Sequence, residues 1–294
     1  MRSTGIISRD MAEIWPGVLL TAYLAVTGAR MAFGTGQGNA IVLAVHMALL
    51  AIALACLLAP AIPAWLADWL PMIALPFLYA ELPVVIAAVG HARTFDAAVS
   101  RWDIAVFGGV PSTDWARAWP ATLLSEALHA AYASYYLIVF SVPALLYWRS
   151  RRRDFNEAVF VVLLSFITCF LAYSVFPVDG PRYRGIQPMP GAIRAAVLWL
   201  LERGSSSGTA FPSSHVAVAA TQCILATRYF GARGALLWVP TVGLAVGAVY
   251  GGFHYAVDVV AGLTVAGVVS TFGLIAVRRA RLAQGFQANA TAPM

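Results

Sequence analysis

Residues 157–177, EAVFVVLLSFITCFLAYSVFP, form the stretch of sequence that decides the fold. A membrane-spanning helix needs about 20 predominantly apolar residues, and this run has that length and character. The arginine-rich stretch RSRRRD, residues 149–154, precedes it, and the polar loop that starts VDGPRYRG, residues 178–185, follows it. An apolar run with a charged segment at each end predicts a helix that crosses a membrane.

The composition extends this prediction to the whole chain. Of the 294 residues, 61% are hydrophobic and 11% are charged, whereas a soluble domain has about 45–50% apolar and about 25% charged residues. A chain this apolar cannot hide its apolar surface in one water-facing globule. The sequence therefore predicts an all-α fold, a polytopic membrane helical bundle of about eight spans. The predicted spans are 14–33, 40–59, 70–90, 127–148, 157–177, 214–230, 235–253 and 257–277.

The arginines indicate the topology of this bundle. All nineteen basic residues are arginine, and the net charge is +6. If the N-terminus is cytoplasmic, eleven of them fall in cytoplasmic segments, as the positive-inside rule requires. We therefore interpret them as topology signals of a multi-pass cell-membrane protein with both termini cytoplasmic, and expect no nucleic-acid partner. For the stretch RSRRRD, a role as a topology anchor is favoured over a role as a binding site for anionic lipids. The eleven are Arg2, Arg9, Arg149, Arg151, Arg152, Arg153, Arg228, Arg233, Arg278, Arg279 and Arg281.

Three polar islands then fall on the extracytoplasmic side, and HYAVD, residues 254–258, is the first of them. His254 and Asp258 are four residues apart, so on a helix they share one face. A carboxylate there can accept a hydrogen bond from one ring nitrogen, fix the tautomer and leave the other nitrogen outward. This is the arrangement of a base and its orienting partner in nucleophilic catalysis. An incidental pair at a helix end is the alternative interpretation.

The second and third islands are FPSSH, residues 211–215, and GPRY, residues 180–183. Ser213 and Ser214 fall at a predicted helix N-terminus, where free N–H groups favour an anion, and His215 could protonate an oxygen that leaves it. Alternatively, Ser213 only caps the helix and His215 lies at the membrane interface. The guanidinium of Arg182 matches phosphate oxygens, unless it simply faces water or lipid headgroups.

Taken together, an arginine in a loop, then P-S-x-H and then H-x-x-x-D resemble the membrane-bound type 2 phosphatidic acid phosphatase superfamily, over roughly residues 95–275. FGGVPSTDW (107–115) and SEALHAAYASYY (125–136) are similar to its inositol phosphorylceramide synthase-like branch. The resemblance implies a six-helix core. It divides the chain into N-terminal membrane helices (1–90), a catalytic membrane domain (91–283) and a short C-terminal tail (284–294). Residues 91–126 are expected to lie on the outer surface.

The resemblance also implies the role of each residue. His254 would be the nucleophile that forms phosphohistidine, Asp258 would orient it, and His215 would be the acid and base. Arg182, Ser213 and the N–H groups near Ser214 would bind the phosphate. The family acts without a metal or other cofactor, at the extracytoplasmic face. The partners implied are a phospholipid or lipid phosphate substrate, an alcohol or lipid acceptor, and the surrounding membrane lipids.

This sequence departs from the family pattern at two cationic positions. Val175 stands where the pattern has lysine, and Gly247 and Ala248 stand where it has Ser-Arg; Ser214 replaces a frequent glycine. A phosphomonoester carries about −1.5 to −2 charge, whereas a diester carries about −1, so fewer cations favour a diester. The sequence thus slightly favours transfer of a headgroup phosphate to an alcohol over hydrolysis by water. Arg184 could replace one of the lost cations.

Two further hypotheses remain from the sequence. Glu81 lies inside a predicted span between Pro76 and Pro83, and His46 lies in another span, features that also occur in transporters. The absence of paired, repeated broken helices favours instead that Glu81 pairs with a polar group or lines the substrate cavity. A metal site of His215, His254 and Asp258 is possible in principle, but the neighbouring serines and arginine favour an oxyanion.

Overall fold

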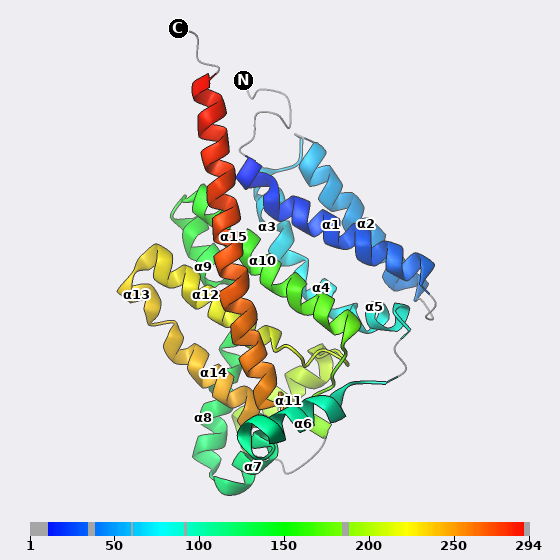
Figure 1. The fold of residues 1–294 in the computed structure, drawn as a ribbon, viewed down its shortest axis with the longest axis vertical. Helices are drawn as coiled ribbons and strands as arrows, with labels where there is room; N and C mark the ends of the chain where they lie inside the picture. Colours follow the sequence, from blue (N-terminus) through cyan, green and yellow to red (C-terminus); the bar gives the residue numbers. More distant parts are fainter. Residues whose placement is uncertain (1–10, 35–38, 60, 91–92, 184–187, 291–294) are drawn as a thin grey trace.

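The computed structural model describes residues 11–34, 39–59, 61–90, 93–183 and 188–290, and it is helical throughout (Figure 1). Apart from α-helices, these residues contain a 3₁₀ turn, Pro181–Tyr183, and one isolated β-bridge, Val178 to Thr209. The predicted all-α fold is confirmed. The helices are α1 Met11–Phe33, α2 Ala40–Leu58, α3 Ala64–Ile73, α4 Leu75–Ala80, α5 Leu82–Ala88, α6 Asp96–Phe107, α7 Pro111–Ala118, α8 Thr122–Ala133, α9 Tyr135–Trp148, α10 Arg152–Val175, α11 Ala192–Gly204, α12 Ser214–Phe230, α13 Ala232–Ala235, α14 Trp238–Tyr250 and α15 Ala256–Ala290.

Six helical stretches of the described chain are long and apolar enough to cross a membrane, and a bent pair of helices makes a seventh. The predicted span 214–230 coincides with α12, whose 17 residues lie at the lower limit for a spanning helix. A membrane-embedded bundle is therefore supported, while the number eight stays a prediction. The six are Glu13–Phe33, Ala40–Leu58, Thr122–Trp148, Arg152–Val175, Ala232–Tyr250 and Ala256–Gln284.

Helix α10, which contains residues 157–175 of the long apolar run, is the centre of the bundle. In its most apolar stretch 67% of the residues are buried, more than in any of the other five stretches. Helices α1, α9, α12 and α15 all pack against it (Figure 1). Since α1 belongs to residues 1–90, the N-terminal helices share a core with the rest of the chain, and the division into domains stays a prediction.

The predicted span 70–90 is bent at Glu81. The helices before and after this residue, Ala64–Ala80 and Leu82–Ala88, meet at 62°. Pro76 and Pro83 lie in the first turns of α4 and α5. Proline lacks the N–H that a continuous helix would need at that position, so it starts a new helix readily but does not continue one.

The carboxylate at this bend is paired with His46 of α2. The Nδ1 atom of His46 lies 2.7 Å from Glu81 Oε2, and its Nε2 lies 2.8 Å from the carbonyl oxygen of Leu24. Because a carbonyl only accepts, Nε2 carries a hydrogen, and the pair shares one further proton and is neutral as a whole. Both side chains are buried. The expectation that Glu81 pairs with a polar group is confirmed.

Glu81→Ala should destabilise the bundle strongly, because it leaves His46 buried without its partner. Breaking a buried pair costs about 3–5 kcal/mol, whereas apolar residues in both places are often neutral. We therefore expect a clear fall in the thermal unfolding temperature of the detergent-purified protein, and recovery of most of it in the control H46L/E81L. A Glu81→Ala protein that unfolds at the wild-type temperature would contradict this account.

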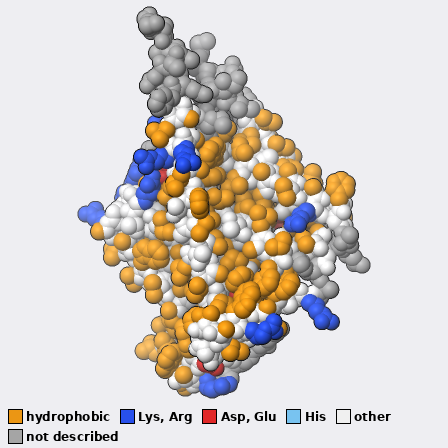
Figure 2. Space-filling model, in the orientation of Figure 1, with side chains coloured by type: hydrophobic (Ala, Val, Ile, Leu, Met, Phe, Trp, Pro, Cys, Tyr) orange, Lys and Arg blue, Asp and Glu red, His pale blue; other side chains and the backbone are white. Residues whose placement is uncertain are grey.

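One end of the bundle is basic and is organised around the buried carboxylate of Glu157. Arg281 Nη1 lies 2.8 Å from its Oε2, and Arg228 Nε lies 3.2 Å from its Oε1. Along α15, Arg281 is about 38 Å from Ala256 at 1.5 Å per residue. The basic end and the start of α15 are therefore separated by more than a hydrocarbon core of about 30 Å. Figure 2 shows hydrophobic side chains over much of the visible face, with a group of arginines near its upper left.

Candidate active site

A pocket lies where the loops 178–183 and 205–210 meet the start of α12 and the turn before α15. Three residues singled out from the sequence, Arg182, His215 and His254, line it together. Its walls include the side chains of Tyr79, Tyr132, Arg182, Ser205, His215 and His254. The packing of the bundle thus brings three of the predicted residues into one small volume, beside the start of α15.

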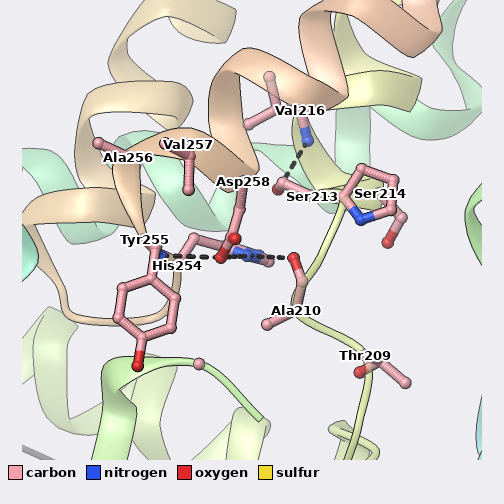
Figure 3. A network of polar contacts seen from close by, with 12 residues as sticks. Thr209, Ala210, Ser213, Ser214, Val216, His254, Tyr255, Ala256, Val257 and Asp258 are labelled. Carbon is pink, nitrogen blue, oxygen red and sulfur yellow. Dashed lines mark hydrogen bonds and ion pairs between the residues drawn. The ribbon is translucent and has the colours of Figure 1, made fainter. Parts of the chain in front are cut away.

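His254 lies in the turn between α14 and α15, and its ring is held from one side (Figure 3). Its Nδ1 is 3.0 Å from the carbonyl oxygen of Ala210 and 3.4 Å from Asp258 Oδ2. Because both partners are acceptors, Nδ1 carries the hydrogen and Nε2 keeps its lone pair. The predicted pairing of His254 with Asp258 is present, and the Ala210 carbonyl is a second, closer partner that the sequence did not indicate.

The surroundings of His254 favour its neutral form. Its side chain is only 5% exposed. Burial lowers the pKa of His254 to about 4, the Ala210 carbonyl opposes this shift, and the positive charge of Arg182 adds to it. At neutral pH the ring is therefore unprotonated, as a nucleophilic nitrogen has to be.

His215 occupies the first turn of α12 and faces His254. The two ring centroids are 5.9 Å apart. Tyr132 and Tyr135 flank the His215 ring, with centroids at 5.3 and 4.3 Å. Its Nδ1 has no hydrogen-bond partner within the described chain. Two imidazoles thus face one pocket, one fixed by acceptors and the other held only by aromatic packing.

Arg182 forms the basic wall of the pocket from the 3₁₀ turn Pro181–Tyr183. Its Nη1 donates to Ser205 Oγ at 2.7 Å, so both side chains present donors to the same space. Ser205 begins the serine-rich run SSSGTA, residues 205–210, which none of the motifs described above includes. Asp179 is the acidic residue nearest to Arg182 in the sequence. It accepts hydrogen bonds from the Ser207 hydroxyl and from the Gly208 N–H. Arg184, the other predicted phosphate ligand, lies outside the described residues.

Ser213 and Ser214 support the start of α12 and are not among the described residues that form the pocket wall. Ser213 Oγ accepts from the Val216 N–H at 3.4 Å, as a helix cap does (Figure 3). The Ser214 N–H donates to the hydroxyl of Tyr173 at 3.1 Å. Both serine side chains are buried, and among the described residues neither lines the pocket. The placement favours capping, the alternative that the sequence left open for Ser213.

Helix α6 holds the site through two buried carboxylates. Asp96 accepts from the N–H groups of Asp179 and Gly180 at 3.0 and 2.9 Å. Asp103 accepts from Ala256 and Val257 at 3.2 and 2.9 Å, where the free N–H groups of α15 begin. One helix therefore fixes both the loop that carries Arg182 and the turn that carries His254.

The sequence contained a signal for these two acids. Asp96 and Asp103 are seven residues apart, which places them on one face of a helix. Both lie in the segment 91–126 that was expected on the outer surface. An acidic pair on one face of a helix is a candidate for capping backbone groups elsewhere, although the sequence does not show which groups these are.

Asp103→Asn and Asp96→Asn should each reduce turnover without removing any group that touches substrate. Each amide keeps one acceptor oxygen of the two, so one backbone N–H loses its partner and the held segment shifts. A displacement of about 1 Å at a reacting group can cost about 10²-fold in rate, so we expect about a 10- to 100-fold lower kcat with a smaller change in KM. The measurement is steady-state turnover of a lipid phosphate in detergent.

The matched control is Asp114→Asn. Asp114 is exposed and accepts from the Val110 N–H within its own segment. This variant should keep wild-type turnover. Equal losses in all three variants would mean that the effect is one of stability and would remove the positioning role.

Tyr79, from the N-terminal helices, also reaches the pocket. Its hydroxyl lies 3.0 Å from Thr209 Oγ1. Thr209 donates its own hydrogen to the Ser206 carbonyl at 2.7 Å, so Tyr79 is the donor of this bond. Ser206 Oγ in turn donates to the Tyr79 carbonyl at 2.8 Å. Nothing in the sequence indicated this contact, because it joins residues 130 positions apart.

Tyr79→Phe should weaken substrate binding by about 2- to 10-fold, the range of one lost hydrogen bond. The expected change is mainly in KM, because the loop 205–210 loses a tether while both histidines stay in place. Tyr136→Phe is the control, since Tyr136 is half exposed and is not among the described residues that line the pocket. An unchanged KM in Tyr79→Phe would show that this wall of the pocket does not meet the substrate.

The apolar helices and the pocket of two histidines and an arginine indicate a membrane-embedded protein with a candidate phosphate site. The model of the PAP2 superfamily matches residues 97–272, and the chain belongs to this superfamily. Comparison with curated proteins gave no match, and neither did comparison with solved structures. The match confirms the superfamily expected from the motifs and leaves its branches undecided. Tyr79 and the His46–Glu81 pair lie outside the matched residues.

Proposed function

We propose that this protein is a membrane lipid phosphotransferase that works through a phosphohistidine at His254 and passes the phosphate group to an alcohol. The observation that carries the proposal is the pair of imidazoles in one pocket with Arg182, with the Nε2 lone pair of His254 left free. Membership of the PAP2 superfamily supports phosphatase or phosphotransferase chemistry. The identity of the acceptor and the individual steps are our inference.

In the first step, His254 Nε2 attacks phosphorus and the bond from phosphorus to the oxygen of the lipid glycerol breaks. The departing oxygen takes a proton from His215, whose protonated form is favoured by the negative charge of the bound phosphate, and leaves as an alcohol. The hydrogen on His254 Nδ1 stays between Ala210 and Asp258, so the positive charge that develops on the ring faces a carboxylate. The guanidinium of Arg182 and the Ser205 hydroxyl are placed to donate to the non-bridging oxygens.

In the second step, neutral His215 takes the proton of the incoming hydroxyl, whose oxygen attacks phosphorus, and the N–P bond breaks. His254 returns to its neutral form. Transfer and hydrolysis therefore differ only in which hydroxyl reaches His215.

Ser213 and Ser214 contribute by holding the start of α12 rather than by binding phosphate directly, and the cycle needs no metal. Within the described residues, no group of three or more His, Cys, Asp or Glu side chains could hold a metal ion.

The charge of the pocket favours a diester substrate. Of the described residues that line it, Arg182 is the one cation, and Asp179 lines it as well. Ala248 stands at a position where the family pattern has arginine, and it is buried in an apolar cluster with Tyr132 and Phe253. A doubly charged monoester would find little compensation here, whereas a diester carries about one negative charge. This supports transfer of a headgroup phosphate, with hydrolysis of a lipid phosphate as the second candidate.

The extracytoplasmic side is the proposed location of this chemistry. The pocket lies beside the start of α15, and Arg278, Arg279 and Arg281 lie in the distal part of the same helix. If the arginine-rich end is cytoplasmic, as the positive-inside rule favours, the pocket opens at the opposite face of the membrane. The inositol phosphorylceramide synthase-like branch stays a prediction from the sequence.

A phosphate-fate assay in detergent tests this proposal. Headgroup-labelled phosphatidylinositol or phosphatidic acid is supplied with and without a ceramide acceptor, and the label is followed. We expect labelled acceptor lipid from the diester. Release of free phosphate from phosphatidic acid, with no labelled acceptor lipid, would refute the transfer reaction and identify the protein as a hydrolase.

His254→Ala and His215→Ala separate the two histidines. His254→Ala should abolish turnover together with any acid-labile, base-stable phosphoenzyme, because the attacking nitrogen is gone. His215→Ala should lower kcat by about 10²–10⁴, the usual contribution of a general acid and base, while phosphoenzyme still forms. Turnover that survives in His254→Ala would refute the phosphohistidine mechanism.

A further inference from the structure

The arginines at the basic end of the bundle include two groups that differ in their partners. Four of them are matched with carboxylates: Arg151 with Asp154, Arg152 with Asp68, and both Arg228 and Arg281 with Glu157. These pairs tie the α9–α10 connection and α15 into one end of the bundle. Their charges are compensated within the protein, so they have little left to offer a ligand.

Arg149 and Arg233 form the second group. Neither guanidinium group makes an ion pair or a hydrogen bond to any described residue. The guanidinium of Arg149 lies over the ring of Phe230, 5.3 Å from its centroid. Both side chains are exposed. Two guanidinium groups therefore keep their full charge and hydrogen-bonding capacity at this end of the bundle.

These two arginines line one large cavity. It has a volume of about 610 Å³, within the range of about 300–1,000 Å³ that ligand sites occupy. Apart from the arginines its walls are mainly apolar, with Leu145 from α9 and Leu237 and Pro240 at the start of α14. None of its lining residues lines the histidine pocket. The cavity thus joins an apolar trough to two uncompensated cations.

We propose that this cavity binds an anionic phospholipid of the surrounding membrane, with its phosphate between Arg149 and Arg233 and an acyl chain along the apolar wall. Guanidinium groups match phosphate oxygens in geometry and charge. Basic pockets between membrane helices are suited to anionic headgroups. The apolar wall has no counterpart in a free phosphate ion, so the site selects a lipid rather than a soluble anion.

This site differs in kind from the catalytic pocket. It lies at the end where α9 and α12 finish, whereas the histidines lie where α12 and α15 begin. The bound lipid is a ligand that stays intact, because the cavity has no histidine or carboxylate among its described lining residues. Its expected role is to anchor the α9, α12 and α13 ends against the headgroup region, independently of the proposed chemistry.

The test is native mass spectrometry of the full-length, detergent-purified protein titrated with phosphatidylglycerol, phosphatidylcholine or inorganic phosphate. We expect phosphatidylglycerol to bind most tightly, and R149Q/R233Q to bind it about tenfold or more weakly, since each arginine near a headgroup contributes appreciably. The matched control is R278Q/R279Q, which removes two exposed arginines at the same end that do not line the cavity. It should bind like the wild type.

A third variant, Leu145→Trp, fills the apolar wall without changing any charge, and it should also weaken binding of phosphatidylglycerol. Unchanged unfolding temperatures and elution profiles establish that the variants are folded. Equal losses in R149Q/R233Q and R278Q/R279Q would overturn the proposal in favour of general surface charge. Phosphatidylcholine or inorganic phosphate binding as tightly as phosphatidylglycerol, or no effect of Leu145→Trp, would overturn it as well.

Discussion

The Ser213 N–H donates to the Asp258 carbonyl oxygen at 3.0 Å, and this bond joins the first turns of α12 and α15. The two helices can approach this closely because residue 262 is glycine: a Cβ atom there would lie 2.6 Å from the Ser213 carbonyl oxygen. The same contact places the Ala210 carbonyl against His254 and the His215 ring opposite it. The geometry of the candidate site therefore depends on this backbone contact between α12 and α15, in which Ser213 has a structural role.

The carboxylates of α6 extend this junction outward. A helix start and a loop turn both leave N–H groups without partners, and such groups are costly where water is scarce. Asp96 and Asp103 accept from four of them, across 83–84 and 153–154 positions of sequence respectively. Burial raises the pKa of Asp103, and the two N–H groups of α15 oppose that shift. Helix α6 thus holds both the loop that carries Arg182 and the turn that carries His254.

The bundle separates two kinds of arginine site along its length. Near the start of α15, Arg182 lines a small pocket with two histidines, which is the proposed reaction site. At the other end, Arg149 and Arg233 line a large apolar cavity that has no histidine or carboxylate among its described lining residues. In our proposals the same guanidinium chemistry serves turnover in one setting and lipid anchoring in the other, because the neighbouring side chains differ.

The sequence by itself determined the membrane-embedded helical class, the positions of the long apolar helices, and the pairing of His254 with Asp258, since each depends on local composition or on a four-residue spacing. It also pointed to Arg182 and His215 through the family motifs. Only the tertiary structure decided that Ser213 and Ser214 support the backbone, that Ala210 shares the orientation of His254, and that Tyr79 and Ser205 reach the pocket. Such contacts join distant segments, and helix packing, which no local pattern encodes, decides which of them meet.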